Sequence, residues 1–555
     1  MESSSIEITR LDHHGLVSSV IDEMNLVEII NSRVKNHGNR EVSVGHCVKA
    51  MIINGLGFTI RVLYLTPNFF KDKPIDLLVG PGITAESLNK DSLSSALDVL
   101  YEYGVSKLFM IISFYVHKLY NIPMLAKHLD STTLSMQGIG TGEDCDVGVR
   151  VIPGYNKEGQ HNLPQIVLNL ISNNIGGLPM FLKVMNGNTQ DKIGFKETIE
   201  EYQSELKKQE EIDESLFVAD SSLYTAENIK SLSNGLCWLT RAPHALIWVK
   251  ALYESSENEE WQPIEGETNY SYQSGKTQYG GVSQGYLLML SQKKQISDLK
   301  GIEEKIDKEN KLINQKIAKL NKQEYATEEL AMAKITVLNK SLNYHELENV
   351  ILVAHPKYGK GRRNENSVPK SYYYKIESSA LRLKDEVITK AKNKAGKFVL
   401  VTNDIHPKVS GSKGEKLFKK PVEKLLDLYK NGQQHVERGF RFIKGGQFRL
   451  SKFFVRTPGR IVAISMIICL ALLVYLIAQW KLRKGLQDAN ETLPNQIGKQ
   501  VKNPTMNWIF QIFQGISVLT IKGEKDLEGK IIGRTDLHKK VIEMMNFSNS
   551  TVYGC

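Results

Sequence analysis

The sequence predicts an α/β protein: a mixed sheet with helical cover, interrupted by an inserted α+β region and preceded by a helical region. Amphipathic helical patterns broken by Gly and Pro fill residues 1–120. From residue 121 the hydrophobic period becomes that of strands, with helical stretches among them. This alternation is typical of a mixed sheet covered by helices. Because a chain of 555 residues is too long for one core, we expect about three or four domains.

The N-terminal region is predicted to start its helices at capping residues. Ser43 precedes an apolar stretch and is predicted to cap a helix that begins at Val44. Thr84 and Asp91 mark the starts of two further predicted helices. This pattern fits a small helical DNA-binding module and plain helical packing equally well.

The predicted sheet is built from short apolar runs. Asn-Asn-Ile-Gly-Gly at residues 173–177 separates two of these runs and predicts a hairpin turn. Residues 192–208 are predicted to form a helix, and residues 226–232 a short one. The expected strands are residues 124–130, 147–153, 163–172, 177–185, 216–219 and 236–241.

Residues 245–395 interrupt this pattern. Residues 261–292 are rich in Tyr, Gly, Thr and Ser and are predicted to form short strands. Apolar residues then recur at three- and four-residue steps from Leu299 to Leu320, which predicts an amphipathic helix that needs a partner face. A helical hairpin within one chain and an intermolecular coiled coil both satisfy that need, and the short repeat favours the hairpin. Strands return at residues 372–376 and 397–403.

Residues 461–480 form an uncharged apolar segment flanked by Arg460 and Lys481. Its length and hydropathy are those of a membrane span. A helix buried on all sides in a large α/β domain has the same composition. We favour the buried helix, because the segment is solitary and basic residues flank both of its ends.

The positive charge of the chain is concentrated in one region. The formal net charge is +10 and the pI is near 9.0. Residues 351–460 carry 26 Lys and Arg against 9 Asp and Glu. A phosphate-binding surface has this character, and so has a solvated basic face. The five cysteines form no CxxC or Cys/His cluster, so neither a disulfide framework nor a zinc site is expected. No secretory signal is evident, and a reducing cytosol fits best.

Three carboxylates are the strongest candidates for chemistry: Asp130, Asp220 and Glu437. The two aspartates are predicted at strand ends and the glutamate on a helix. Converging carboxylate oxygens can hold hard divalent cations such as Mg²⁺, which keep positions open for phosphate and water. This chemistry indicates a phosphodiester, and hence a nucleic acid substrate. An Asp at a strand end can equally be a turn former or a helix cap.

The predicted helix around Glu437 presents one polar face and one apolar face. Its polar residues are spaced by four, four and three, so they share one side of the helix with an aromatic ring two turns earlier. Such a face could hold metal and phosphate together, or it could be a solvent-exposed ion-pair face. The residues of this polar face are Tyr429, Gln433, Glu437, Arg441 and Lys444.

These residues resemble a known family. The order Asp130, Asp220, Glu437 resembles DDE transposases of bacterial insertion sequences, in the group whose third acid carries a tyrosine–arginine–glutamate–lysine signature. Gln433 stands where the signature has arginine, and Tyr429 is one residue further from the glutamate than usual. A glutamine can donate to a phosphate oxygen but brings no charge. Further segments that resemble this group are residues 11–15, 53–57, 128–133, 154–165, 187–191, 218–225 and 238–241.

The resemblance implies an RNase H-like catalytic domain with two strand-borne aspartates, a helix-borne glutamate and an insertion between the second and third acids. The expected domains are a helical, DNA-binding domain (1–120), the first part of the catalytic domain (121–244), the inserted strand-rich and helical domain (245–395), the second part of the catalytic domain (396–484) and a C-terminal region (485–555).

The resemblance also implies the activity, which is DNA cleavage and strand transfer at the ends of the element. Asp130, Asp220 and Glu437 would be catalytic and would hold two Mg²⁺ ions, with Mn²⁺ as a substitute. The residues expected to bind DNA are Tyr429, Gln433, Arg441 and Lys444.

The expected partners are double-stranded DNA, as terminal inverted repeats and as target, and a second copy of the chain in the DNA complex. No membrane partner is expected. The expected location is the bacterial cytoplasm, at the nucleoid when DNA is bound. Two other functions stay open: a DNA-binding protein derived from a transposase that has lost catalysis, and a protein anchored in the membrane by residues 461–480.

Overall fold

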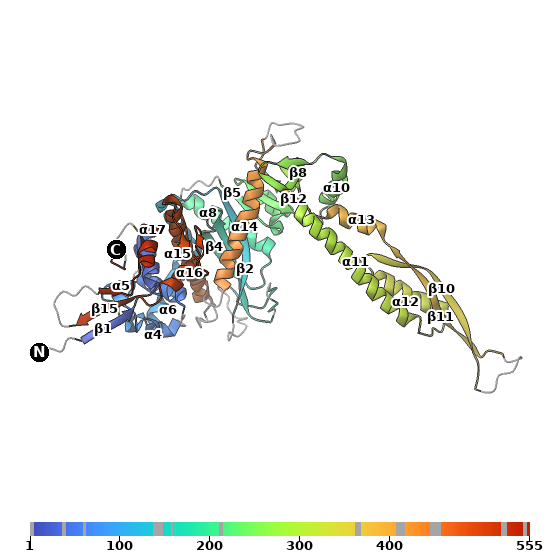
Figure 1. Ribbon diagram of the computed structural model, residues 1–555, viewed down its shortest axis with the longest axis horizontal. Coiled ribbons are helices and arrows are strands. Elements are labelled where there is room, and N and C mark those ends of the chain that lie inside the picture. Colours follow the sequence, from blue (N-terminus) through green and yellow to red (C-terminus); the bar gives the residue numbers. More distant parts are fainter. Residues whose placement is uncertain are drawn as a thin grey trace. The chain divides into compact units, whose positions relative to one another are not determined.

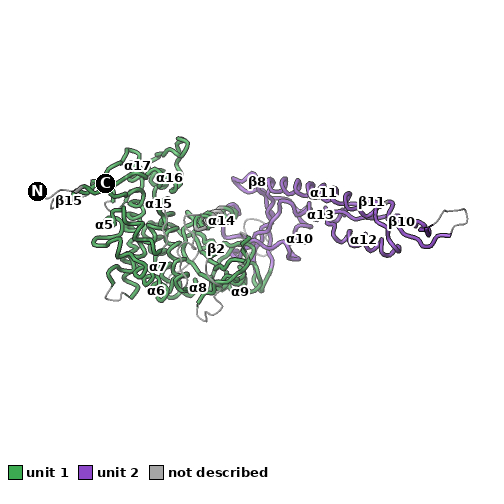
Figure 2. The backbone as a smooth tube through the Cα atoms, turned by 90° about the horizontal axis from the view of Figure 1, so that it is seen from below, with its two compact units in different colours: residues 1–240, 278–282, 424–555 green, residues 241–277, 283–423 purple. Residues whose placement is uncertain are grey.

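The computed structural model of the protein forms two compact units (Figures 1 and 2). Unit 1 comprises residues 1–240, 278–282 and 424–555, and unit 2 comprises residues 241–277 and 283–423. The structure describes residues 5–35, 40–58, 63–136, 148–156, 159–160, 162–209, 215–360, 368–406, 417–444, 457–522, 530–547 and 552–554. Within these ranges, the structure describes only the backbone of residues 5, 258, 378, 431–437, 443–444 and 522.

Helices dominate the N-terminal part of unit 1, as predicted. Ser43 caps one of them, because its hydroxyl oxygen accepts a hydrogen bond from the backbone N–H of His46 at 3.3 Å. The helix predicted to start at Asp91 is present and begins one residue earlier, at Lys90, capped by the side chain of Asn89. The start predicted at Thr84 was wrong, because Thr84 is followed only by a short 3₁₀ turn. The main helices are α1 (His14–Glu23), α2 (Leu26–Arg33), α3 (Val44–Leu56), α6 (Lys90–Tyr103) and α7 (Val105–Leu119).

The chain's first strand pairs with a strand near its other end. β1 (Ser5–Arg10) runs antiparallel to β15 (Ser517–Lys522), which also pairs with β16 (Lys530–Ile532). No helical period predicts β1, and its partner lies about 500 residues away in sequence. The local pattern of residues 1–120 therefore could not reveal it.

The central sheet of unit 1 has the order β4-β3-β2-β5-β6. β2 to β4 are antiparallel neighbours, whereas β5 and β6 continue from β2 in parallel. This arrangement confirms the mixed-sheet α/β class. The strands are β2 (Ala126–Ser135), β3 (Gln165–Asn173), β4 (Pro179–Asn186), β5 (Leu216–Ala219) and β6 (Trp238–Ala242), and the helices between them are α8 (Asp191–Lys208) and α9 (Ala226–Leu232).

For two connections of this sheet, one prediction from the sequence was correct and one was wrong. Gly176 and Gly177 both have φ of +70° in the turn between β3 and β4, which confirms the hairpin at residues 173–177. The strand predicted at residues 147–153 is absent from residues 148–153, where Ile152 alone makes an isolated bridge to Gln165. Pro153 has no N–H to donate to a ladder, and Gly148 has a positive φ, so this segment is a loop. Val147 lies outside the described residues.

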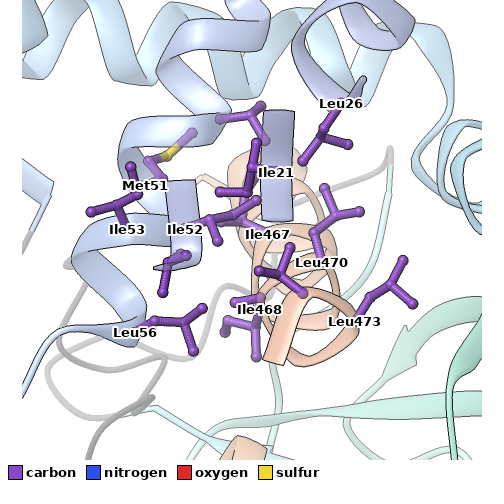
Figure 3. Packing of buried hydrophobic residues seen from close by; sticks show 14 of the residues in the cluster. Ile21, Leu26, Met51, Ile52, Ile53, Leu56, Ile467, Ile468, Leu470 and Leu473 are labelled. Carbon is purple, nitrogen blue, oxygen red and sulfur yellow. The ribbon is translucent and has the colours of Figure 1, made fainter. Parts of the chain in front are cut away.

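The apolar segment 461–480 is a central helix of unit 1. It lies within α15 (Pro458–Asp488), and 89% of the apolar window of this helix is buried within the protein. Its length and composition would also allow a membrane span, but its surroundings are those of a core helix. Figure 3 shows Ile467 and Leu470 of α15 packed beside Ile21 of α1, with α3 on the neighbouring side. Helices on several sides of α15 explain why its sequence is apolar all round.

His13 is buried and contacts residues from both the N-terminal and the C-terminal part of unit 1. Its Nε2 lies 2.9 Å from the carbonyl oxygen of Leu56, its Nδ1 lies 3.0 Å from Nε2 of Gln514, and its ring stacks on Phe510. A neutral imidazole satisfies both hydrogen bonds, with one nitrogen donating and the other accepting. Burial lowers the pKa of His13 from 6.5 to about 4.

We expect acidification to destabilise the protein through His13. Between the unfolded pKa of 6.5 and the folded pKa of about 4, the unfolded state binds a proton that the folded state does not. Stability is therefore lost as the pH falls through this window, by at most about 1.4 kcal/mol per pH unit for this group. His13→Gln should weaken the pH dependence of the free energy of unfolding, measured by urea denaturation. His406→Gln, at an exposed position, should leave that dependence unchanged, and equal pH slopes for His13→Gln and the wild type would contradict the expectation.

Unit 2 contains a sheet and an extended helix–ribbon module. The sheet has the order β12-β9-β8-β7, and β8 and β9 are longer than the short strands predicted for residues 261–292. Its strands are β7 (Gln262–Ile264), β8 (Glu267–Tyr279), β9 (Val282–Ser291) and β12 (Lys397–Thr402), and its helices include α10 (Ile247–Ser255) and α13 (Asp385–Lys394).

The amphipathic helix of the insertion finds its partner within the chain. It forms α11 (Gln292–Leu320), which packs with α12 (Glu328–Lys340) on the two-stranded ribbon of β10 (His345–Lys357) and β11 (Ser371–Leu383). This confirms the interpretation as a hairpin within one chain. The buried residues of the module are Ile313, Tyr325, Ala331, Ile335, Leu338, Leu342, Leu347 and Ile376.

Candidate active site

The sheet of unit 1 brings Asp130 and Asp220 to the same level. β2 and β5 are parallel neighbours, and Leu129 is aligned with Ala219 in their register. Asp130 directly follows Leu129, and Asp220 directly follows Ala219. Adjacent strands lie about 4.8 Å apart, so the two backbones hold their carboxylates on neighbouring strands.

The two aspartates line one small cavity that is partly open to solvent. Tyr429 of α14 (Val422–Lys444) reaches the same cavity, so three of the predicted site residues are gathered there. His128 is also in its wall, because side chains two residues apart on a strand share a face of the sheet. The lining residues are His128, Leu129, Asp130, Val218, Ala219, Asp220 and Tyr429.

Asp220 lies directly after β5, where the strand-end prediction placed it. Its Oδ1 accepts a hydrogen bond from the backbone N–H of Ser222 at 2.9 Å, so it caps the 3₁₀ turn Ser221–Leu223. The hydroxyl of Thr240 on β6 donates to the backbone carbonyl of Asp220 at 2.7 Å. The capping role and the cavity position are therefore compatible, and the cap fixes the direction of the carboxylate.

Asp130 was wrongly expected at the end of its strand. It lies in the middle of β2, which continues for five residues to Ser135 in register with β3. The Ser-Thr-Thr sequence that follows Asp130 extends the ladder with β3, as β-branched threonine favours. The Oδ1 of Asp130 accepts a hydrogen bond from the N–H of Ser131 at 2.7 Å.

Two neighbours of the aspartates were assigned no role from the sequence. His128 is buried and lines the cavity. Asp191, at the start of α8, accepts a hydrogen bond of 2.6 Å from the hydroxyl of Ser131. The period of two along β2 could have pointed to His128. No local signal points to the contact between Ser131 and Asp191, which are 60 residues apart.

α14 carries the remaining predicted residues. Arg441 is exposed and does not line the cavity. The backbone of Glu437 is helical and lies two turns beyond Tyr429, about 12 Å along the axis. The side chains of Gln433, Glu437 and Lys444 lie outside the description.

The C-terminal part of α14 is held against α15. Phe440 is buried in the core of unit 1, and the ring of Phe442 lies 4.5 Å from that of Tyr475 on α15. Leu426 is buried at the other end of the helix. The apolar face predicted for this helix thus faces the interior, which fixes the rotation of α14 beside the sheet.

The donor atoms at this cavity suit a hard cation. Asp130 and Asp220 provide carboxylate oxygens, the ligands that Mg²⁺ and Mn²⁺ prefer. Within the ranges that the structure covers, no three His, Cys, Asp or Glu side chains are close enough to hold a metal ion. The predicted third donor is Glu437 on α14, whose side chain is not among those described.

A family model described as "Transposase DDE domain" matches residues 127–474, which is more than half of the chain. The chain belongs to the DDE transposase family. This transposase is an enzyme of DNA transposition, as the resemblance in its acidic segments implied, and its family depends on divalent metal ions in general. A second family model, described as "Domain of unknown function (DUF4277)", matches residues 6–114 of the transposase.

Solved transposase structures are only distantly similar to this transposase. The piggyBac transposase in its synaptic complex with hairpin DNA shares 10% identity, with 92% of this chain and 83% of that chain covered and a TM-score of 0.34. The Mos1 transposase in its paired-end complex with the left transposon end shares 14% identity, with 40% and 65% covered and a TM-score of 0.15. No curated protein matches the chain.

Proposed function

We propose that this transposase cleaves DNA at the ends of an insertion sequence and joins them to new DNA, using Asp130, Asp220 and Glu437 with two Mg²⁺ ions. The single observation that supports this best is the shared cavity, which gathers both aspartates and Tyr429 from three separate elements. Family membership supplies the reaction class.

Asp130, Asp220 and Glu437 would hold the ions. When bound, Mg²⁺ would supply a water of lowered pKa and positive charge beside the phosphate. The hydrogen bonds from Ser131 to Asp130 and from Ser222 to Asp220 hold the carboxylates in place beforehand. Such preorganisation lowers the cost of reaching the reactive geometry.

The DNA strand would be held by the polar face of α14. Tyr429 lies at the cavity and would position the strand at the scissile phosphate. Gln433, Arg441 and Lys444 would contact neighbouring phosphates, with Gln433 acting as a neutral donor. Arg441 is exposed to solvent and is accessible to a phosphate.

The DNA would be double-stranded, both as terminal inverted repeats and as target. Residues 1–120 would form the DNA-binding domain that recognises the repeats. A dimer would hold both ends of the element. The protein would act in the bacterial cytoplasm, at the nucleoid. Inverted repeats that bracket the gene would support this assignment.

Metal removal tests the proposed chemistry. We expect EDTA to abolish cleavage of a terminal-repeat duplex and to leave its binding intact, because the acids act through the ions and not as the main DNA contacts. Mg²⁺ should restore cleavage, and Mn²⁺ should substitute for it. Gel analysis of an end-labelled duplex measures cleavage, and fluorescence anisotropy measures binding. Tight binding with no cleavage in either metal would favour a transposase that has lost catalysis.

A further inference from the structure

A buried amide network fixes the loop that precedes β3. Gln165 is fully buried, and its Nε2 donates to the backbone carbonyls of Tyr155 at 3.1 Å and Gly187 at 2.8 Å. Asn156, also buried, donates from Nδ2 to Oε1 of Gln165 at 2.9 Å and to the hydroxyl of Ser135 at 2.8 Å. We call Gln165, Asn156 and these contacts the amide clamp. It ties the loop to the end of β2 and to the segment after β4.

Two glycines let the backbones meet at the amide clamp. A Cβ on Gly154 would lie 2.1 Å from the carbonyl oxygen of Gly187, and a Cβ on Gly187 would lie 2.1 Å from that of Gln165. No side chain larger than hydrogen fits at either position. Gly154, Gln165 and Gly187 belong to segments that the family resemblance singled out without assigning a role. Together they hold residues 154–156 against Gln165 and Gly187.

The amide clamp presents an aromatic ring to solvent. Tyr155 lies between Gly154 and the buried Asn156, and its side chain is 78% exposed. A single exposed apolar residue is ordinary on a protein surface. A rigid backbone under an exposed tyrosine is more specific, because such a ring offers a large contact area at little cost in conformational entropy on binding.

A cation near the amide clamp suits a polyanion. Arg150 is exposed, and its backbone carbonyl accepts a hydrogen bond from the N–H of Gly187 at 3.1 Å. An aromatic ring with a cation on the neighbouring segment is a combination that binds nucleic acid strands.

The amide clamp is also at a defined distance from the aspartates. It holds Ser135, five residues beyond Asp130 on β2. At about 3.3 Å per residue, Ser135 lies about 17 Å along β2 from Asp130. We propose that Tyr155 packs on the DNA strand within several nucleotides of the scissile phosphate, with Arg150 holding an adjacent phosphate. This position rests on the proposed function, because it takes Asp130 as the centre of cleavage.

The test compares the full-length wild type with Tyr155→Ala and Tyr155→Phe. The probe is a fluorescent duplex that contains the terminal repeat and its flanking DNA, in EDTA so that cleavage plays no part. We expect Tyr155→Ala to bind about tenfold more weakly, since stacking on one base contributes about 1–3 kcal/mol. Tyr155→Phe, which keeps the ring, should bind as the wild type does. Ile497→Ala, at a side chain that is 85% exposed, is the matched control and should not change affinity.

Shortened duplexes locate the contact and separate its two sources. If the ring packs on the element's own end, the Tyr155→Ala penalty should vanish once that side is cut back past the contact, and removal of the flanking side should have no such effect. The opposite result assigns the contact to flanking DNA. Equal affinities of Tyr155→Ala and the wild type on the full duplex would overturn the proposal, as would a Tyr155→Phe variant that binds as weakly as Tyr155→Ala. Cleavage that persists in Asp130→Asn would refute the catalytic assignment instead, and these affinities do not depend on that outcome.

Discussion

Asp130→Asn is expected to abolish cleavage and to leave DNA binding unchanged. The substitution keeps the shape of the side chain and its hydrogen bond to the N–H of Ser131, but it removes the charge that a divalent cation needs. Loss of several kcal/mol of transition-state stabilisation corresponds to a fall in rate on the order of 10³-fold. Asp220→Asn should behave in the same way, because its carboxylate lines the same cavity.

A matched control for this prediction is Asp427→Asn. Asp427 lies on α14 two residues before Tyr429, is exposed, and is absent from the cavity lining. It should cleave a labelled terminal-repeat duplex at the wild-type rate. Asp130→Asn should bind that duplex with wild-type affinity in an anisotropy titration. Full cleavage by Asp130→Asn would end the assignment of this cavity as the active site.

Lys481→Met is expected to destabilise the core of unit 1 strongly. The ammonium of Lys481 lies 2.8 Å and 2.7 Å from the two carboxylate oxygens of Glu23, and both side chains are less than a tenth exposed. Removal of one partner leaves an uncompensated buried charge, which costs about 3–5 kcal/mol. The midpoint of urea unfolding should fall accordingly.

Two further variants test whether the missing charge is the cause. Lys484→Met removes an exposed cation from the same helix and should change the free energy of unfolding by less than about 0.5 kcal/mol. The double variant Glu23→Leu/Lys481→Met should recover most of the lost stability, since an apolar pair often replaces a buried ion pair without loss. A Lys481→Met protein as stable as the wild type would show that Glu23 is not confined in the core.

Local patterns predicted the elements that local forces determine. Ser43 was recognisable as a cap because its hydroxyl serves an N–H three residues away. Asp220 was recognisable because an apolar strand stops immediately before it. α15 could be predicted as a buried helix because it is apolar on every side.

Contacts between distant segments of the chain explain the features that the sequence did not predict. The extension of β2 past Asp130 depends on its ladder with β3, which hydroxyl-bearing residues can join as well as apolar ones. β1 exists because β15 lies beside it, and nothing in residues 1–10 encodes that partner. The meeting of Gly154 with Gly187 likewise depends on tertiary packing. The family resemblance was the only ground for predicting Tyr429 at the site. The positions of His128 and Asp191 became evident only in the structure.

Because α15 lies late in the chain, the core of unit 1 can be completed only late in translation. α1 and α3 pack on a helix that begins only at Pro458, so their apolar faces stay uncovered on the ribosome until most of the chain has been made. Apolar surface left uncovered in this way makes a nascent chain prone to aggregation. A product that terminates before α15 would keep the same surface exposed.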